Sequence, residues 1–159
     1  MNSLIKTEDD WGMTLIRVSL GLVFFPHGLQ KTFGSFGGPG FIPFMHALTY
    51  GMHIPAVFAF LAIMAEFLGS IGLIAGLLTR IAAFGIAVNM AVAIAVLNGQ
   101  FGPFMNWSGK QPGEGYEFHV LVIGMALALM IKGGGAFSID AALSRKSVPQ
   151  TAAAPFVHR

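Results

Sequence analysis

Apolar residues gather into four long runs along the chain, separated by segments rich in polar residues, glycine and proline. The runs cover residues 13–33, 55–80, 81–97 and 117–132. With a helical rise of about 1.5 Å per residue, some 20 residues cross the roughly 30 Å hydrocarbon core of a bilayer. The pattern therefore predicts four membrane-spanning helices.

The segments between these runs predict how the helices are connected. Residues 41–50 lie in a glycine- and proline-rich stretch and are too few to cross a bilayer, so we expect an interfacial or re-entrant segment in the first outer loop. Residues 98–116 form a second polar loop, and the three glycines 133–135 are expected to end the fourth helix. The predicted fold is an all-α integral membrane four-helix bundle.

The ends of the chain are polar. We expect residues 1–12 to be a cytoplasmic N-terminal segment, 13–143 to be the transmembrane domain, and 144–159 to be a disordered, basic cytoplasmic tail. No basic segment or small-residue cleavage site precedes the first apolar run, which favours a retained helix over a signal peptide. Ser138 is expected to cap a short surface helix before the tail.

Basic residues are divided unevenly between the two ends of the predicted bundle. One end of the bundle would contain both termini and the turn between the second and third helices. Its basic residues would be Lys6, Arg17, Arg80, Lys132, Arg145, Lys146 and Arg159. The other end would hold Lys31 and Lys110. Cytoplasmic loops of membrane proteins carry the excess of lysine and arginine, so both termini are predicted to be cytoplasmic.

Composition agrees with the membrane class. The chain of 159 residues is 55% hydrophobic and 10% charged, with a mean hydropathy of +0.72, whereas soluble domains carry about 25% charged residues. The absence of cysteine excludes disulfides, thiolate catalysis and iron–sulfur ligation. The net charge of +2 is too small to indicate nucleic-acid binding.

One acid, Glu66, lies in the middle of the second run. A carboxylate at the centre of a spanning helix costs roughly 2.5–3.5 kcal/mol, which the many apolar residues around it offset. Small residues share its face of the helix at 100° per residue: Ala62, Ala65, Gly69, Gly72 and Gly76. Because small residues let membrane helices approach closely, Glu66 is predicted to point into the bundle.

Other ionisable groups are predicted to lie at a similar depth. Counted from the cytoplasmic helix ends, His27, Glu66, Glu117 and His119 all lie about 18–22 Å up their helices. A carboxylate beside a histidine can share or relay a proton, and clustered polar groups in an apolar bundle suit the head group of a quinone. We predict that Glu66 and His27 carry proton chemistry there.

The third and fourth helices add two expectations to this polar layer. Asn89 is expected to form a hydrogen bond between helices. Glu117 and His119 are about 160° apart on the helical wheel, so both cannot face one point. Glu117 shares its face with Gly124 and Ala128 and is therefore expected to face inward.

Two alternatives remain for the charged residues. Arg17 and Lys31 could extend to opposite membrane interfaces, as long basic side chains do. Glu66 and His27, with Arg17, could instead form a structural polar lock between helices. A dinuclear metal site is disfavoured because the chain lacks a pair of helices with the Glu-x-x-His motif. Haem is disfavoured because no residue pattern that would support haem-ligating histidines is present. No metal site is therefore predicted.

Three short patterns occur in order along the chain. They are Arg17-x-x-x-Gly21 with His27-Gly28-Leu29-Gln30-Lys31; Glu66-x-x-Gly69 with Gly76-Leu77-Leu78-Thr79-Arg80; and Asn106-Trp107 with Gly113-x-Gly115-x-Glu117, Gly133-Gly134-Gly135 and Ser138-x-Asp140. With this ordered set, spanning residues 13–143, the chain resembles the DoxX family of small four-helix bacterial membrane proteins.

The resemblance implies a multi-pass protein of the bacterial inner membrane. Some members of that family are membrane subunits of thiosulfate:quinone oxidoreductase, and others are linked to thiol or oxidative-stress systems. The resemblance implies functional positions at His27, Lys31, Glu66, Arg80, Glu117 and Asp140. His119 lies outside the pattern. Because the chain has no cysteine or soluble redox domain, sulfur chemistry would have to come from a partner subunit.

We therefore expect the membrane subunit of a quinone-linked oxidoreductase, with a redox partner protein and a second copy of the chain as partner classes. The expected quinone-binding set is His27, Lys31, Glu66, Glu117, Trp107 and Arg17. Two alternatives are a non-enzymatic membrane scaffold that docks a redox partner and a carrier of a small solute.

Overall fold

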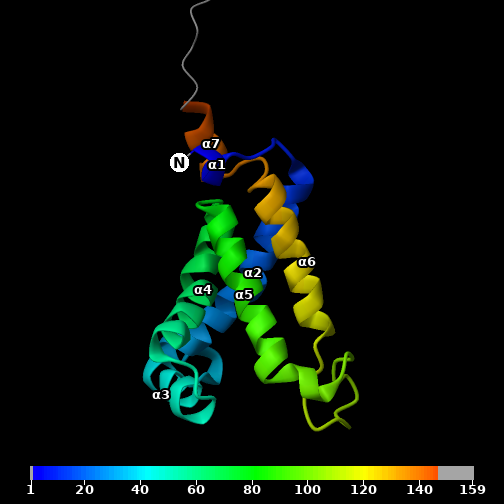
Figure 1. Ribbon diagram of the computed structural model, residues 1–159. Helices are drawn as coiled ribbons and strands as arrows, with labels where there is room; N and C mark the ends of the chain where they lie inside the picture. Colours follow the sequence, from blue (N-terminus) through cyan, green and yellow to red (C-terminus); the bar gives the residue numbers. More distant parts are fainter. Residues whose placement is uncertain (1, 147–159) are drawn as a thin grey trace, which may run out of the picture.

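The computed structural model describes residues 2–146, which contain helices and no strand (Figure 1). Four long helices form the bundle: α2 (Trp11–Phe33), α4 (Ala56–Ala75), α5 (Thr79–Val96) and α6 (Glu117–Lys132). Short helical segments join or flank them: α1 (Asn2–Ile5), η1 (Ser35–Gly37), α3 (Phe41–His46), η2 (Ala47–Gly51), η3 (Asn98–Phe101) and α7 (Ile139–Lys146). The expected tail falls mostly in residues 147–159, outside the described range.

Three of the long helices, α2, α4 and α5, are long and apolar enough to cross a membrane, and α6 adds 16 residues of similar character. The predicted all-α membrane four-helix bundle is thus confirmed, as is the short helical segment between the first two long helices, which α3 and η2 form. We call the end of the bundle with α1, α7 and the α4–α5 turn the basal end, and the opposite end the loop end (Figure 1).

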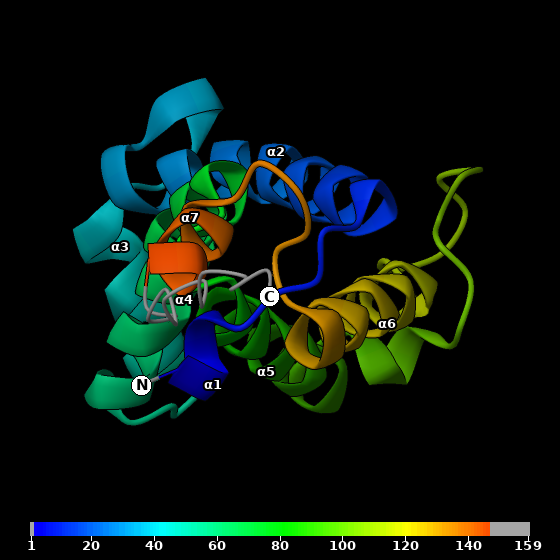
Figure 2. The same cartoon turned by 90° about the horizontal axis from the view of Figure 1, so that it is seen from above.

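Helices that follow one another in sequence also pack together. α4 lies between α2 and α5, α5 packs on α6, and α6 also contacts α2 (Figure 2). The core between them is apolar and includes Leu20, Phe24, Leu73, Ile86 and Leu129. A short turn, residues 76–78, joins α4 to α5, whereas the longer segments 34–55 and 97–116 join α2 to α4 and α5 to α6.

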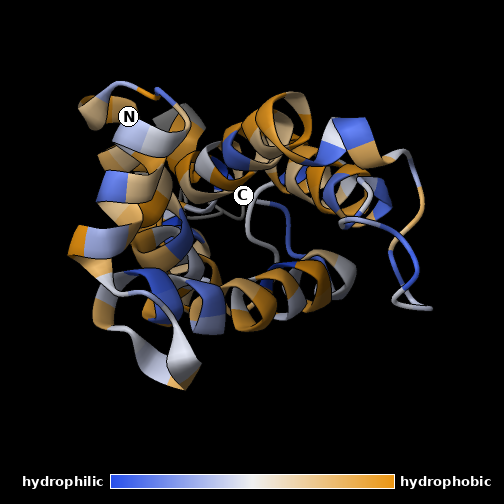
Figure 3. Ribbon diagram, turned by 90° about the horizontal axis from the view of Figure 1, so that it is seen from below, coloured by the Kyte–Doolittle hydropathy of each residue, from blue (hydrophilic) through white to orange (hydrophobic). Residues whose placement is uncertain are grey.

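The outer surface of the bundle is apolar as well. Large side chains on every long helix are exposed, among them Leu22, Leu61, Phe84 and Leu121. Figure 3 shows that the long helices are mostly apolar and that polar residues gather in the connecting segments and at a few positions within the helices. A surface of this kind fits lipid tails, whereas soluble proteins rarely expose such continuous apolar areas.

Glycines set the close packing of α2 on α4. A Cβ atom placed on Gly28 would lie 2.6 Å from the Cα atom of Phe67, and one on Gly21 would lie 2.8 Å from Cγ1 of Ile74. On the next side of α4, Cβ atoms placed on Gly69 and Gly72 would lie 3.6–3.9 Å from Ala82 of α5. The predicted small-residue face of this helix therefore does lie against neighbouring helices.

Substitution of Gly28 by alanine is expected to lower the free energy of unfolding by about 1–3 kcal/mol, because the added methyl group clashes with the Phe67 backbone and pushes α2 away from α4. Gly124→Ala on α6 is the matched control, since its added Cβ has no neighbour within 4 Å. Unfolding of both variants in mixed detergent, followed by circular dichroism, measures the difference. Equal stability of the two variants would contradict the close approach.

Candidate functional site

Glu66 lies on α4 in the middle of the bundle and is only 2% exposed. The Lys31 Nζ atom lies 2.5 Å from both carboxylate oxygens of Glu66 and donates to Oε1. The Asn89 side chain on α5 donates to the same Oε1 at 2.7 Å. The Lys31–Glu66–Asn89 cluster therefore joins three helices, and the predicted inward orientation of Glu66 and the interhelical hydrogen bond of Asn89 are confirmed.

Helix geometry explains why these residues meet. Glu66 lies about 14 Å from the basal end of α4, and Asn89 about 15 Å from the start of α5, so the two side chains share one level. Lys31 lies nearer the loop end of α2. Side chains on a helix tilt toward its N-terminus, which directs the long Lys31 side chain back toward that level.

The charges of the cluster balance each other in an apolar environment. A lone carboxylate at this depth would be costly, and an ammonium group in contact offsets its desolvation. Lys31 is 24% exposed, whereas Glu66 is almost fully covered. The ring of Phe44 on α3 lies 5.1 Å from Lys31 Nζ, within cation–π range. Lys31 is therefore the more accessible partner of the ion pair.

One carboxylate oxygen of Glu66 has spare bonding capacity. Oε1 accepts from both Lys31 and Asn89, whereas Oε2 has the ion-pair contact with Lys31 but no hydrogen bond of good geometry within the described residues. A carboxylate oxygen can accept two hydrogen bonds or hold a proton. The cluster thus contains a proton-accepting atom close to a proton-donating ammonium group.

Arg17 lies apart from this cluster, at the basal end, and is 2% exposed. Its Nη1 atom donates to the carbonyl oxygens of Leu73 and Ile74 at 2.6 and 2.8 Å, and Nε donates to Gly134 at 2.8 Å. Two of these acceptors lie at the C-terminal end of α4, where helix carbonyls run out of partners, although Leu73 also accepts the N–H of the capping Gly76. Arg17 and Lys31 thus both bond to groups within the bundle, and their position relative to the membrane interfaces stays a prediction.

Asp140 completes the basal network from the first turn of α7. Its two carboxylate oxygens accept the backbone N–H groups of Leu78 and Thr79, each at 2.8 Å, and its own N–H donates to Gly76. It therefore caps the N-terminus of α5 from a distant part of the chain. Sequence reasoning missed this role, and a local signal for it is absent because the partners are more than 60 residues apart.

A family model matches the part of the chain that contains the Lys31–Glu66–Asn89 cluster and Arg17. The model of the DoxX family matches residues 12–99, more than half of the chain. This chain belongs to the DoxX family. The match covers α2, α4 and α5, so it includes Arg17, Lys31, Glu66 and Asn89, and it ends before α6. No curated protein and no solved structure matches the chain.

The structure of this DoxX-family protein places His27 away from the cluster. His27 is exposed on α2, and its ring lies 6.2 Å from that of Phe24. Within the described residues it has no hydrogen bond or ion pair to Glu66. The buried side of α2 follows Arg17, Phe24 and Gly28, so His27 lies at the edge of that side and faces the surroundings of the bundle.

Glu117 and Trp107 meet each other at the loop end instead. Glu117 Oε1 accepts the backbone N–H of Met105 at 2.8 Å and contacts Nε1 of Trp107 at 3.4 Å. Both residues are exposed, as is Gly124 on the same side of α6. The expected inward orientation of Glu117 is not found, because α6 buries Val122, Ala126 and Leu129 instead. Glu117 organises the 98–116 loop.

The other histidines among residues 2–146 lie apart from one another. His46 lies near Tyr50 in the segment between α2 and α4, at 4.6 Å between ring centroids, and His53 is exposed. His119 lies edge-on to Phe118 on α6. Among residues 2–146, no three histidine or acidic side chains are grouped as ligands for a metal ion. Within the bundle, the Lys31–Glu66–Asn89 cluster offers groups for hydrogen bonding and proton transfer.

Proposed function

We propose that this DoxX-family protein is the membrane subunit of a quinone-linked oxidoreductase in the bacterial inner membrane. The observation that carries the proposal is the Lys31–Glu66 pair, an acid and a base held together inside a lipid-facing bundle. Intramembrane ionisable residues generally mark functional sites. The excess of basic residues at the basal end supports cytoplasmic termini.

The cluster has the groups that a quinone head group needs. Quinone carbonyls accept hydrogen bonds, and their rings pack against apolar or aromatic side chains. The Lys31 ammonium carries three N–H donors, of which Glu66 engages part, and the Phe44 ring lies beside it. Because Lys31 is the more exposed partner, it is the residue that would hold a carbonyl oxygen.

The contacts of each residue in the cluster indicate its role in the proposed reaction. A quinone bound there would supply a two-electron, two-proton acceptor. Lys31 would deliver a proton to the carbonyl oxygen, and Glu66 Oε2 would receive protons and return them to the resulting amine. Asn89 holds the carboxylate in place from α5. The electrons would come from a partner protein that oxidises a thiol or another sulfur compound.

Substitution of Glu66 by glutamine is expected to lower quinone reduction in membranes with the partner present by about 100-fold, the lower range for loss of an acid–base group. Glu114→Gln is the matched control, because Glu114 is an exposed loop carboxylate that accepts from the Asn106 backbone. Quinone retained after purification in mild detergent is measured by mass spectrometry for each variant.

The two measurements separate the proposal from its alternatives. Quinone co-purifying with the unchanged protein, together with loss of reduction in Glu66→Gln alone, supports the oxidoreductase subunit. Absence of bound quinone with unchanged reduction would overturn it. A Glu66→Gln protein that loses stability and keeps full reduction would support the structural lock and the scaffold alternative.

A further inference from the structure

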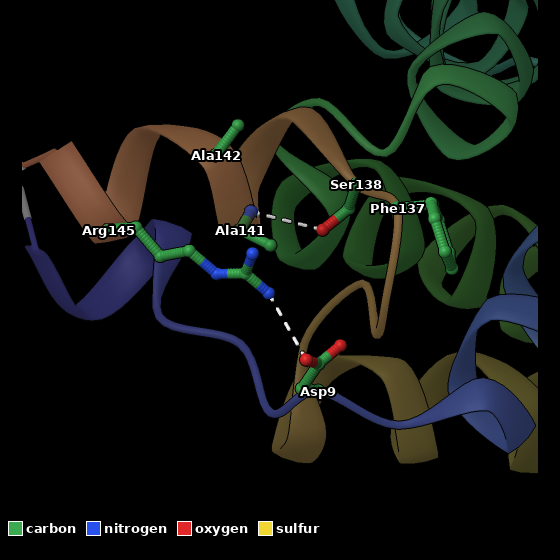
Figure 4. A pocket seen from close by; sticks show the side chains of 6 residues that line it. All are labelled: Asp9, Phe137, Ser138, Ala141, Ala142 and Arg145. Carbon is green, nitrogen blue, oxygen red and sulfur yellow. Dashed lines mark hydrogen bonds and ion pairs between the residues drawn. The ribbon is translucent and has the colours of Figure 1, made fainter.

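A cavity of about 260 Å³ lies at the basal end, between the N-terminal segment and α7 (Figure 4). Its lining consists of Asp9, Phe137, Ser138, Ala141, Ala142 and Arg145. The function proposed above makes no use of it. The cavity is smaller than the roughly 300–1,000 Å³ of sites that enclose whole small molecules, so it suits a small group attached to a larger molecule outside.

The rim of the cavity carries one positive and one negative side chain. Arg145 Nη2 lies 3.2 Å from Asp9 Oδ2, and the two side chains are 69% and 68% exposed. Figure 4 shows Arg145 reaching from α7 toward Asp9 on the N-terminal segment. Exposed ion pairs of this kind contribute little to stability. Both charges are therefore free to exchange partners with a ligand.

The remaining lining is apolar or already satisfied. Ala141 and Ala142 offer only methyl groups, and the Ser138 hydroxyl donates to Gly135 and accepts from the Ala141 backbone. A ligand group would thus find hydrogen-bonding capacity only at the charged rim. Because the rim charges sum to zero, a group with both a positive and a negative charge matches it better than a simple anion or cation.

Aromatic residues place the cavity at the level of lipid headgroups. Phe137 lines the cavity and packs on Trp11, with ring centroids 4.8 Å apart, and both rings are exposed. Trp11 is the first residue of the spanning helix α2. Tryptophan at the end of a spanning helix lies in the membrane interface, where its ring contacts headgroups and upper acyl chains. The cavity therefore opens where phospholipid headgroups are concentrated.

We propose that this cavity binds the headgroup of a zwitterionic aminophospholipid, with its phosphate on Arg145 and its ammonium on Asp9. Both contacts are charge-assisted hydrogen bonds, which are stronger than neutral ones. The acyl chains remain outside, beside Trp11 and Phe137. A phosphocholine group lacks N–H donors for Asp9, and an anionic phosphoglycerol group lacks the positive charge, so the site favours phosphoethanolamine.

The full chain in lipid nanodiscs or mild detergent, analysed by native mass spectrometry, tests the site. With phosphatidylethanolamine, phosphatidylcholine and phosphatidylglycerol offered together, the unchanged protein is expected to retain phosphatidylethanolamine about tenfold more strongly. Asp9→Asn and Arg145→Gln should each abolish that preference. Ala142→Phe, which fills the cavity, should do the same while both charges remain.

A second ion pair at the same end of the bundle is the matched control. Lys132 and Glu8 are exposed and lie 2.7 Å apart, and they do not line the cavity. Lys132→Gln with Glu8→Gln should leave the lipid preference unchanged. Equal retention of the three lipids by the unchanged protein would overturn the site, as would a preference that survives Ala142→Phe or disappears in the control. Melting temperatures in detergent establish that each variant is folded.

Discussion

Replacement of Lys31 by methionine is expected to destabilise the bundle by about 3–5 kcal/mol, the cost of breaking a buried ion pair by removing one partner. Methionine keeps much of the side-chain length and contact with Phe44 but leaves Glu66 without a counter-charge in an apolar interior. Asn89 can donate one hydrogen bond and cannot neutralise the carboxylate. Detergent unfolding followed by circular dichroism measures the loss.

A double-mutant cycle separates the ion pair from the individual side chains. Adding Glu66→Gln to Lys31→Met removes the unpaired charge, so the double variant is expected to recover most of the lost stability. Lys110→Met is the control, because Lys110 is an exposed lysine of the segment between α5 and α6. If the stability loss of the double variant equals the sum of the two single losses, the ion pair makes no joint contribution.

The limits of the first and fourth helices could be predicted well from the sequence, whereas the second run was expected to reach residue 80 and α4 ends at Ala75, before the left-handed Gly76. The fourth apolar run coincides with α6, and the first ends with α2 at Phe33, just before Gly34 in the left-handed conformation. Lipid admits only segments whose backbone groups are bonded internally, so hydropathy and the following glycine together mark where a spanning helix ends. Tertiary packing has little influence on these limits.

The direction in which polar side chains point was harder to predict. Depth follows from counting residues, and Glu66 was placed correctly because small residues such as Gly69 define its packed side. His27 has no such flanking signal, and the small residues beside Glu117 face the outside of the bundle. Position on the helical wheel gives relative angles and cannot by itself identify which side a neighbouring helix covers.

Contacts between distant segments could not be predicted at all from the pattern. The pairing of Lys31 with Glu66 depends on the crossing of α2 over α4 and on the reach of a flexible side chain. The bonds from Asp140 to Leu78 and Thr79 depend on how the glycine loop returns α7 to the α4–α5 turn. Both require coordinates, because one sequence contains no record of which residues meet.

Replacement of Arg17 by methionine is expected to lower stability by about 3 kcal/mol. The substitution removes the side-chain donor of the Ile74 and Gly134 carbonyl oxygens and one of two donors to Leu73, and each unsatisfied buried group costs about 1–3 kcal/mol before the helices adjust. It also removes the positive charge that interacts with buried Asp140. Arg17→Lys should rescue only part of the loss, because a single ammonium group cannot reproduce the forked geometry that joins α4 to the glycine loop.

Arg80 provides a control with similar bonding and greater exposure. It donates to the carbonyl oxygens of Lys6, Met130 and Ile131 at the basal end, but its outer nitrogen atoms are accessible to solvent. Water can replace those bonds, so Arg80→Met is expected to cost about 1 kcal/mol. Thermal and detergent unfolding of the two methionine variants makes the comparison. Equal losses of stability in the two variants would mean that the burial of Arg17 does not add to the stability of the protein. The basal network would then be stabilised by backbone hydrogen bonds alone.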